Sequence, residues 1–222
     1  MPLTMRLATR MDIGAMTALH MASFSADDHL SALLGPGFVR ASYHWHLTDP
    51  MVWVIVAEFD GEVVGLQGVC DGPFTTRMLR GCSMAVAAAL LRRPRLLADR
   101  RLWSRLVRRK ATVAWAAKFC TEPGVAQMTI GAVSAKTQGH GVLSALIARC
   151  EVEGRSRGLR AVRVGLYRRN LACYRVFVKK SGWVEVSALG SDDTTCFVRV
   201  FHREVFERFP QLAGAGFANL ET

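Results

Sequence analysis

The sequence lacks any long hydrophobic run. Its longest uninterrupted apolar stretch, Met84 to Leu91, has eight residues, whereas a membrane-spanning helix needs about 20. The N-terminal region lacks the continuous apolar core of a secretory signal, because Arg6, Arg10 and Asp12 interrupt it. We therefore expect no transmembrane segment, no signal peptide and a cytoplasmic location.

Closely spaced cysteines are also missing. The six cysteines are scattered along the chain, and no two of them stand at the short spacing typical of metal ligands. This distribution predicts reduced thiols in a cytoplasmic protein and no bound metal.

Acidic residues are nearly absent from one segment. Between Arg77 and Lys118 the chain has twelve Lys or Arg and one acid, Asp99, so this segment carries the whole formal net charge of +11. A neutral body with a single basic limb is not the usual profile of a nucleic-acid-binding fold, and we expect no nucleic-acid partner. The limb is interpreted as a solvated face over capping helices, a homodimer contact, or a membrane-surface helix with Trp103 and leucines opposite arginines.

The 222 residues, half of them apolar, suit one domain with an elaboration. Asp60-Gly61 between two β-branched runs predicts a hairpin, and Pro94 interrupts a long helical segment whose best stretch is 99–111. Residue patterns predict strands over 4–8, 52–59, 62–69, 128–133, 159–166, 182–189 and 194–201, and helices over 11–24, 26–34, 38–47, 74–121, 142–158 and 170–180.

Strands alternate with helices only in the second half of this order. The pattern predicts an α/β protein (α+β in some schemes) with a mixed sheet, helices on both of its faces, and parallel strands around residues 128–150.

The stretch from Met128 to Cys150 is the most informative one. An apolar strand leads through Gln138-Gly139-His140-Gly141 into a helix. The first amides of a helix have no partner inside it, the helix dipole is positive there, and glycines let an anion approach the backbone. The stretch therefore predicts a phosphate-binding loop. It is not a P-loop, which needs Gly-Lys-Ser/Thr, and a dinucleotide fingerprint would need a third glycine and a later acidic residue.

The chain resembles the GNAT-type N-acetyltransferases, which move an acetyl group from acetyl-CoA to an amine. The family loop Val-x-Pro-x-x-(Gln/Arg)-Gly-x-Gly-x-(Gly/Ala) is matched from Val133 to Leu143, with Ala135 in place of the proline and Leu143 in place of the small residue. The family's Asn-x-x-Ala-x-x-x-Tyr-x-x-x-Gly-Phe helix is echoed by Asn170, Cys173, Phe177 and Gly182-Trp183.

The resemblance implies a centrally splayed GNAT-like sheet flanked by helices. It covers one domain over 1–201, with a basic helical insertion at about 74–121 and a C-terminal helix or tail over 202–222. It implies acetyl-CoA as the acyl donor, with no metal. The residues that it places at the cofactor are Ala132, Val133, Gln138, Gly139, His140, Gly141, Val142, Leu143, Ser144 and Asn170.

The catalytic groups are less complete in the sequence. The family's tyrosine protonates the leaving CoA thiolate, but its slot holds Phe177 when counted from Asn170, and Val178 when counted back from Gly182. Tyr174, one helical turn before Phe177, is the predicted substitute. A backbone amide on the strand that ends at Val133 would polarise the thioester carbonyl. Candidates for the base are His44, His46, Asp71 and Glu122, and the alternatives are water that relays the proton to a distant group or an amine that is already partly neutral.

These features predict an acetyl-CoA-dependent N-acetyltransferase that acts on a primary amine of a small molecule. A weaker resemblance, to relatives found with bacterial polysaccharide-biosynthesis enzymes, implies an amino sugar or nucleotide-linked sugar as acceptor, since arginines bind phosphate well. The alternatives are a non-catalytic acyl-CoA-binding or regulatory module and a membrane-surface-associated acyltransferase.

Overall fold

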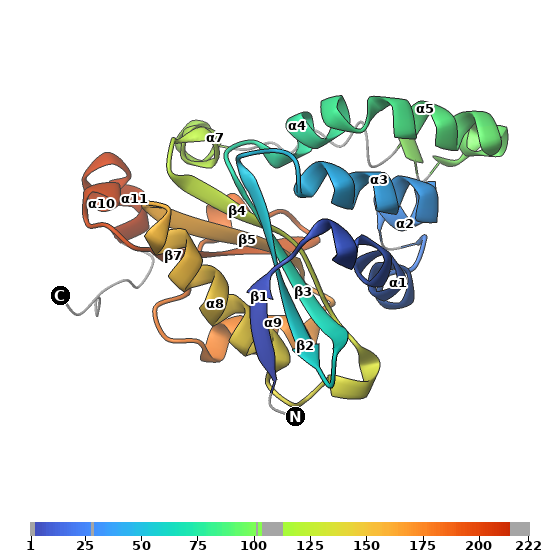
Figure 1. Cartoon of the computed structure of the whole chain (residues 1–222). Coiled ribbons are helices and arrows are strands. Elements are labelled where there is room, and N and C mark those ends of the chain that lie inside the picture. Colours follow the sequence, from blue (N-terminus) through green and yellow to red (C-terminus); the bar gives the residue numbers. More distant parts are fainter. Residues whose placement is uncertain (1–2, 28, 101, 104–112, 214–222) are drawn as a thin grey trace. The chain divides into compact units, whose positions relative to one another are not determined.

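The computed structural model of the chain describes residues 3–27, 29–100, 102–103 and 113–213. Most of the helix predicted over 99–111 lies outside these residues. The seven strands form one mixed sheet in the order β1-β2-β3-β4-β5-β7-β6 (Figure 1). They are β1 (Thr4–Leu7), β2 (Val52–Phe59), β3 (Glu62–Asp71), β4 (Val125–Val133), β5 (Ala161–Tyr167), β6 (Val184–Glu185) and β7 (Thr194–Val200).

Helices fill the connections as the sequence predicts. They are η1 (Arg10–Asp12), α1 (Ile13–Ser23), α2 (Leu30–Leu34), α3 (Pro36–His46), α4 (Phe74–Gly81), α5 (Ser83–Arg92), η2 (Pro94–Ala98), α7 (Ala114–Thr121), η3 (Ala135–Thr137), α8 (Val142–Ser156), α9 (Leu171–Lys179), η4 (Ser187–Leu189), α10 (Glu204–Arg208) and α11 (Pro210–Ala213). No helix of the described residues is long and apolar enough to cross a membrane.

The chain divides into two compact units. Unit 1 comprises Met1–Gly68, Phe74–Arg109 and Ile130–Leu146, and unit 2 comprises Val69–Pro73, Lys110–Thr129 and Ile147–Thr222. The basic insertion is thereby split, because α4, α5 and η2 belong to unit 1 and α7 to unit 2.

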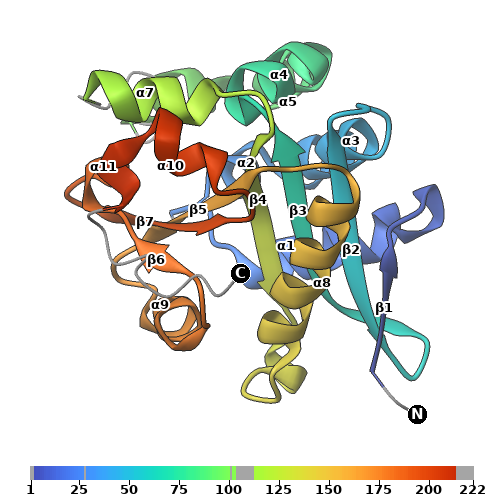
Figure 2. The ribbon, with the colours of Figure 1, turned by 90° about the vertical axis from the view of Figure 1, so that its left-hand side faces the viewer.

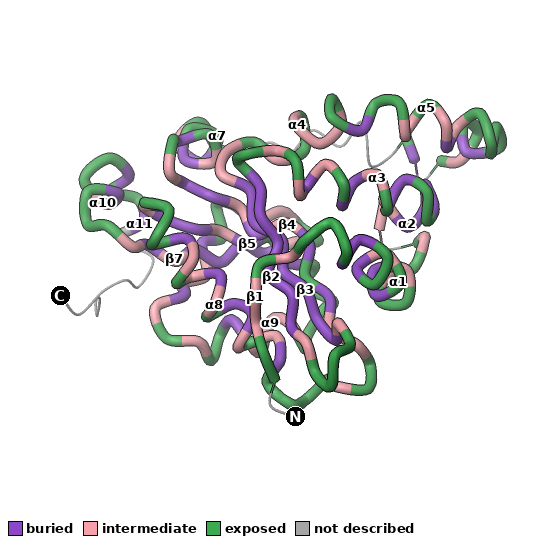
Figure 3. Tube along the Cα trace, in the orientation of Figure 1, coloured by how far each residue is buried: buried purple, intermediate pink, exposed green. Residues whose placement is uncertain are grey.

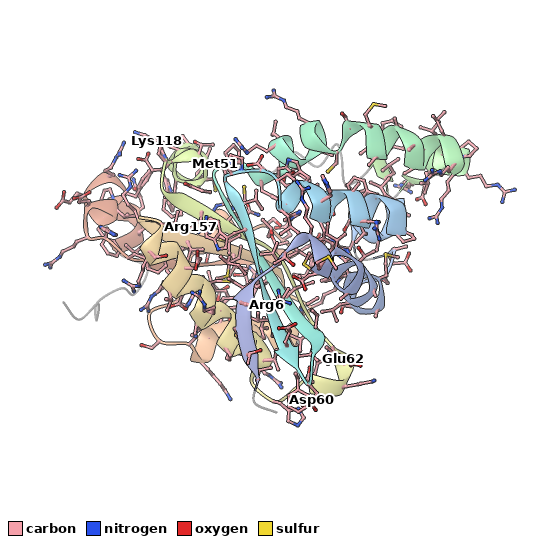
Figure 4. The ribbon with its side chains drawn as sticks, viewed as in Figure 1. Arg6, Met51, Asp60, Glu62, Lys118 and Arg157 are labelled. Carbon is pink, nitrogen blue, oxygen red and sulfur yellow. The ribbon has the colours of Figure 1, made fainter. Side chains whose placement is uncertain are left out.

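In unit 1 the predicted hairpin is confirmed. Asp60 and Gly61 both have positive φ, 51° and 78°, as the turn of a two-residue hairpin requires, and Asp60 and Glu62 mark its tip in Figure 4. β1 pairs antiparallel with β2, from Thr4 opposite Glu58 to Leu7 opposite Ile55. The side chains of α1 and α3 form one core with those of the strands, which includes Met16, Val39, Tyr43, Val54, Val56 and Leu66.

An ion cluster fixes the first strand of unit 1. The Arg6 guanidinium donates to both oxygens of Asp12, at 2.7 and 2.8 Å, and to both oxygens of Glu58, at 2.8 and 2.9 Å. Asp12 is 7% exposed, and its hydrogen bonds from Arg6 lower its pKa to about 2. Arg6 thus joins β1, β2 and the start of α1.

In unit 2, strands of both directions surround β5. β4 runs parallel to β5, from Val125 opposite Ala161 to Met128 opposite Val164, which confirms the predicted parallel pair. β7 runs antiparallel to β5 over seven residue pairs, and β6 pairs with β7 (Figure 2). Phe119, Val205, Phe209 and Leu212 share one buried cluster with these strands, so α10 and α11 contribute to the core of unit 2.

Two predicted elements are wrong in extent. The strand expected over 182–189 has only two residues, because η4 turns the chain and buries Leu189 in the core. The helix expected over 26–34 is reduced to α2, since His29 has extended backbone angles. Gly35 joins α2 to α3: it has φ 91°, and Pro36 begins α3, because proline favours the first helical turn.

Candidate functional site

The predicted strand, loop and helix are present in sequence order. β4 ends at Val133, η3 follows, and α8 begins at Val142. Gly139 and Gly141 have φ of 81° and 77°, a conformation that glycine adopts without steric cost. The two glycines thus turn the backbone into the first turn of α8.

The loop is open on the side where a ligand would approach. Gly139, His140 and Gly141 are exposed, and a Cβ built on either glycine would meet no atom within 4 Å. The Ala145 N–H donates to the Gly141 carbonyl at 3.0 Å, so the helical ladder starts there and leaves the preceding amides outside it. Together with the helix dipole, this geometry suits a phosphate group.

Packing within unit 1 holds the loop in place. The Ser134 N–H donates to the Val64 carbonyl of β3 at 2.8 Å. A Cβ on Gly65 would lie 3.0 Å from both Val142 and Leu146, so the absence of a side chain at Gly65 lets the first turn of α8 pack directly on β3. The helix start is therefore positioned by the sheet.

The predicted cofactor residues of unit 1 occupy this strand, loop and helix start. Ala132 and Val142 are buried and face the core, whereas Gln138 and Ser144 are exposed. The His140 Nδ1 lies 3.0 Å from the Gln138 carbonyl, and Leu143 is half-buried. Contact of these residues with a cofactor stays a prediction.

Gln67 of β3 is a residue that sequence reasoning missed. Its side chain is 4% exposed, and its Nε2 donates to the carbonyls of Gly68 at 3.0 Å and of Ile130 at 3.2 Å. A Cβ on Gly131 would lie 2.4 Å from Gln67 Oε1, so a side chain at this position would displace the Gln67 amide. Gln67 thus fixes β4 just before Ala132 and Val133, and a buried polar residue in an apolar strand was its only sequence signal.

Asn170 caps the N-terminus of α9 in unit 2. Its Oδ1 accepts a hydrogen bond from the Cys173 N–H at 3.2 Å, which satisfies one of the amides that a helix start leaves unpaired. The side chain is exposed, so the cap leaves it accessible, and its predicted contact with the cofactor stays a prediction.

Tyr174 of α9 is held by a carboxylate. Its hydroxyl donates to Glu185 Oε2 on β6 at 2.8 Å, and its ring meets Phe197 edge-on at 5.5 Å. Glu185 also accepts from the buried Thr195 hydroxyl and lies 3.9 Å from Arg168. The hydrogen bond to Glu185 and the charge of that carboxylate raise the pKa of Tyr174, which makes the phenol a weaker acid.

The tyrosine slot of the family lies in the core or on the outside, depending on the register. Phe177 is 1% exposed and packs against Trp183 at 4.8 Å and Phe197 at 5.6 Å. Val178 is 55% exposed. Neither residue supplies a hydroxyl, so Tyr174 is the only tyrosine that α9 offers.

The four candidate bases differ in environment. His44 is exposed on α3, and Asp71 ends β3. His46 is 2% exposed; its Nδ1 lies 2.6 Å from the Ser42 carbonyl, and burial lowers its pKa to about 4, so it is neutral near pH 7. Glu122 is 6% exposed and paired with Arg160, at 3.2 Å, and with Arg208, which gives it a structural role in unit 2.

A buried hydrogen-bond chain in unit 1 was also missed. His20 Nδ1 lies 3.0 Å from the Tyr43 hydroxyl, and its Nε2 lies 3.0 Å from Ser31 Oγ, which is 2.8 Å from His29 Nδ1. Burial lowers the pKa of His20 to about 3. The two histidines are far from any motif in the sequence, and only the packing of α1 against α3 brings Tyr43 to His20.

Comparison with known proteins identifies the fold. No protein-family model and no curated protein sequence matches the chain. Among solved structures it is similar to the PaiA N-acetyltransferase of Thermoplasma acidophilum in complex with coenzyme A, with a TM-score of 0.56, 9% identity, and coverage of 90% of this chain and all of that one.

Two further structures give the same result. The ribosomal-protein-alanine N-acetyltransferase of Brucella melitensis has a TM-score of 0.55 and 16% identity, with 89% and 99% of the two chains covered. A Salmonella typhimurium protein solved with its cofactor acetyl-CoA has a TM-score of 0.53 and 15% identity, with 91% and 96% covered. The chain therefore has the fold of the GNAT acetyltransferases, which confirms the predicted fold class.

Proposed function

We propose that the protein is an N-acetyltransferase that uses acetyl-CoA as acyl donor and a primary amine as acceptor. The observation that carries this proposal is the open loop at the start of α8. Gly139 and Gly141 leave space for an anion beside the backbone, and the loop stands at the end of β4 in a GNAT fold. The coenzyme A and acetyl-CoA named for two similar structures support the choice of donor.

The backbone amides before Ala145 would bind the pyrophosphate of the donor. His140 and Gln138 would lie at the edge of this pyrophosphate site. In the reaction the neutral amine attacks the thioester carbonyl carbon, the C–N bond forms, the C–S bond breaks, and the thiolate takes up a proton while the amine loses one. A backbone amide at the end of β4 would stabilise the carbonyl oxygen as negative charge develops on it. Gln67 would hold that strand through the Ile130 carbonyl.

Tyr174 is the proposed source of the proton for the thiolate. The Tyr174 hydroxyl donates its hydrogen bond to Glu185. Proton transfer therefore requires that this hydrogen bond breaks as the thiolate forms. No other tyrosine lies on α9.

The proposed acceptor is a small primary amine, with an amino sugar or a nucleotide-linked sugar as the specific candidate. The arginine-rich insertion supports a phosphate-bearing acceptor, because guanidinium groups bind phosphate through paired charge-assisted hydrogen bonds. A similar structure is named for an acceptor of another kind, a ribosomal-protein alanine. The fold by itself is compatible with either class.

A second candidate function is acyl-CoA binding without catalysis. The specific observation in its favour is the state of α9: Phe177 is buried in the core, and the Tyr174 hydroxyl is bound by a carboxylate. A module of this kind needs the loop but no proton donor.

The release of CoA separates the two functions. Acetyl-CoA is incubated with the protein and a panel of amino sugars, nucleotide-linked amino sugars, polyamines and N-terminal alanine peptides, and free thiol and acetylated product are measured. Product with any amine supports the transferase. Calorimetric binding of acetyl-CoA without product from the whole panel supports the binding module, and the absence of binding contradicts both.

Replacement of Gly141 by glutamate tests the loop itself. We expect Gly141→Glu to weaken CoA binding about 100-fold, or about 2.7 kcal/mol, because a carboxylate faces the phosphates and the backbone is strained. Gly158→Glu is the matched control: Gly158 follows the same helix, has φ 75° and also has no atom within 4 Å of a built Cβ. Unchanged affinity in Gly141→Glu, or equal loss in both variants, would contradict the loop assignment.

A further inference from the structure

Helix α5 carries an apolar face that the described residues leave exposed. Met84 is 81% exposed and Leu91 is 83% exposed. They lie seven residues apart, about two helical turns, and so project from the same side of the helix, with the exposed Ala87 between them.

The other side of α5 is apolar as well. Ala89 is buried and Val86 and Leu90 are partly buried, and they pack with Leu33, Leu34 and Phe38. A helix that is apolar on all sides is normally buried on all sides. Within the described part of unit 1, Ala89 is the one buried residue of α5, and the rest of its trace is exposed or intermediate (Figure 3).

Two more apolar side chains of the same segment are exposed. Leu97, in η2, is 51% exposed, and Trp103 is 48% exposed. The Trp103 Nε1 donates to the Leu97 carbonyl at 2.6 Å, so the protein itself satisfies the polar atom of the indole. We call Met84, Ala87, Leu91, Leu97 and Trp103 the apolar outer residues.

Positive charge accompanies these residues. Arg80 precedes α5, Arg92 ends it, and Arg93, Arg95 and Arg100 follow, all of them exposed. Asp99 is the single acid of the whole insertion. Exposed apolar side chains and cations therefore occur together in one segment of about 25 residues, a combination typical of helices that lie in a membrane interface.

We propose that the apolar outer residues dock on the surface of an anionic lipid bilayer. The arginines would meet lipid phosphates, while Met84 and Leu91 enter the boundary of the acyl chains. A second copy of the chain is a poorer occupant, because it would bring two strongly basic segments together. A nucleic acid would pair with the arginines but would leave the exposed Met84 and Leu91 without an apolar contact. This proposal is independent of the catalytic one.

Vesicle flotation with the full chain tests the proposal. We expect binding to phosphatidylcholine vesicles that contain about 30% phosphatidylglycerol and little binding to pure phosphatidylcholine. The double variant Met84→Gln/Leu91→Gln should bind at least about 10-fold more weakly, because it removes two side chains that enter the bilayer. The double variant Arg95→Glu/Arg100→Glu should lose at least as much.

Two controls separate this surface from general stickiness. Met11, in η1, is 91% exposed, so Met11→Gln makes the same chemical change at an equally exposed position of unit 1. Arg10 and Arg40 are exposed elsewhere in unit 1, and Arg10→Glu/Arg40→Glu changes the net charge as much as the test variant does. Both controls should bind vesicles within about 2-fold of the native chain.

Several results would overturn the proposal. One is the absence of binding to anionic vesicles, and another is binding that Met84→Gln/Leu91→Gln leaves unchanged, which would show charge attraction alone. A dimer in sedimentation that this same variant dissociates, without vesicle binding by the native chain, would assign the surface to a second copy. Release of CoA with a soluble amine should be equal in the native chain, Met84→Gln/Leu91→Gln and Met11→Gln if the transferase is active.

Discussion

The loop before α8 in unit 1 and helix α9 in unit 2 differ in how far their functional groups are exposed and free of packing. In the loop, Gly139 and Gly141 are open to solvent, and packing on Gly65 fixes the helix start. On α9, Phe177 is packed in the core and the Tyr174 hydroxyl is occupied by Glu185. Binding of an anion needs only backbone amides, whereas proton transfer needs a particular side chain with an available proton. The loop, which depends on backbone alone, therefore has the geometry that its proposed role needs, whereas α9 has Phe177 or Val178 where the resemblance expects a tyrosine.

The largest expected effect of a substitution on α9 is on the stability of the protein. Phe177→Ala should lower the free energy of unfolding by about 3–5 kcal/mol, because it removes a fully buried ring from between Trp183 and Phe197. Leu171→Ala, on the same helix at 58% exposure, should change it by less than about 0.5 kcal/mol. Chemical denaturation measures both.

Phe177→Tyr adds at this position the hydroxyl that the resemblance leads us to expect. We expect it to lower the free energy of unfolding by about 1–3 kcal/mol, since its hydroxyl would enter an apolar core, and to leave the rate of CoA release no higher. A faster release of CoA with unchanged stability would show that a hydroxyl at residue 177 takes part in catalysis. Helix α9 would then be as suited to its proposed role as the loop before α8.

The packing of the loop is the next test. Gly65→Val should cost about 1–3 kcal/mol of stability, because its Cβ would approach Val142 and Leu146 at 3.0 Å. Since these residues form the first two turns of α8, affinity for CoA should also fall. Gly165→Val in β5, where a Cβ meets no atom within 4 Å, is the stability control and should be neutral or stabilising. Equal stabilities of the two variants would show that Gly65 does not position the helix.

The last prediction concerns the pH dependence of the rate. If Tyr174 protonates the thiolate, activity falls at high pH as the phenol ionises, and the raised pKa of Tyr174 keeps it protonated to a higher pH than a free tyrosine. Glu185→Gln removes the negative charge that raises this pKa, so the alkaline fall should move to lower pH. Tyr174→Phe should abolish that fall together with most of the rate. A rate profile that is identical in all three proteins would assign the proton to another group.

Much of the fold was predictable from the sequence because its signals are local. Asp60-Gly61 requires positive φ at both positions, and Glu122-Pro123-Gly124 ends a helix before β4; each acts within a few residues. The strand at 182–189 was overestimated, because its length depends on where Leu189 finds the core and not on its own β propensity.

The sequence also predicted the loop, because a phosphate site made of backbone needs only glycines at the start of a helix. It did not reveal Gln67, Glu185 or the chain from Tyr43 to His29, since their partners lie on other elements: Ile130, Tyr174 and His20. Nor did it place the exposed apolar residues of α5, because the pattern pointed to 99–111, whereas Met84 and Leu91 are 81% and 83% exposed.

By itself, then, the sequence determined the element order, the hairpin, the glycine loop and the location of the excess charge, all of which depend on residue identity and short spacing. Only the tertiary structure decided which side of α5 is covered, whether Phe177 faces the core, and which residue accepts the hydrogen bond of the Tyr174 hydroxyl. The physical reason is that burial and long-range hydrogen bonds depend on two elements that pack together, and the sequence of one element does not specify which element it packs against.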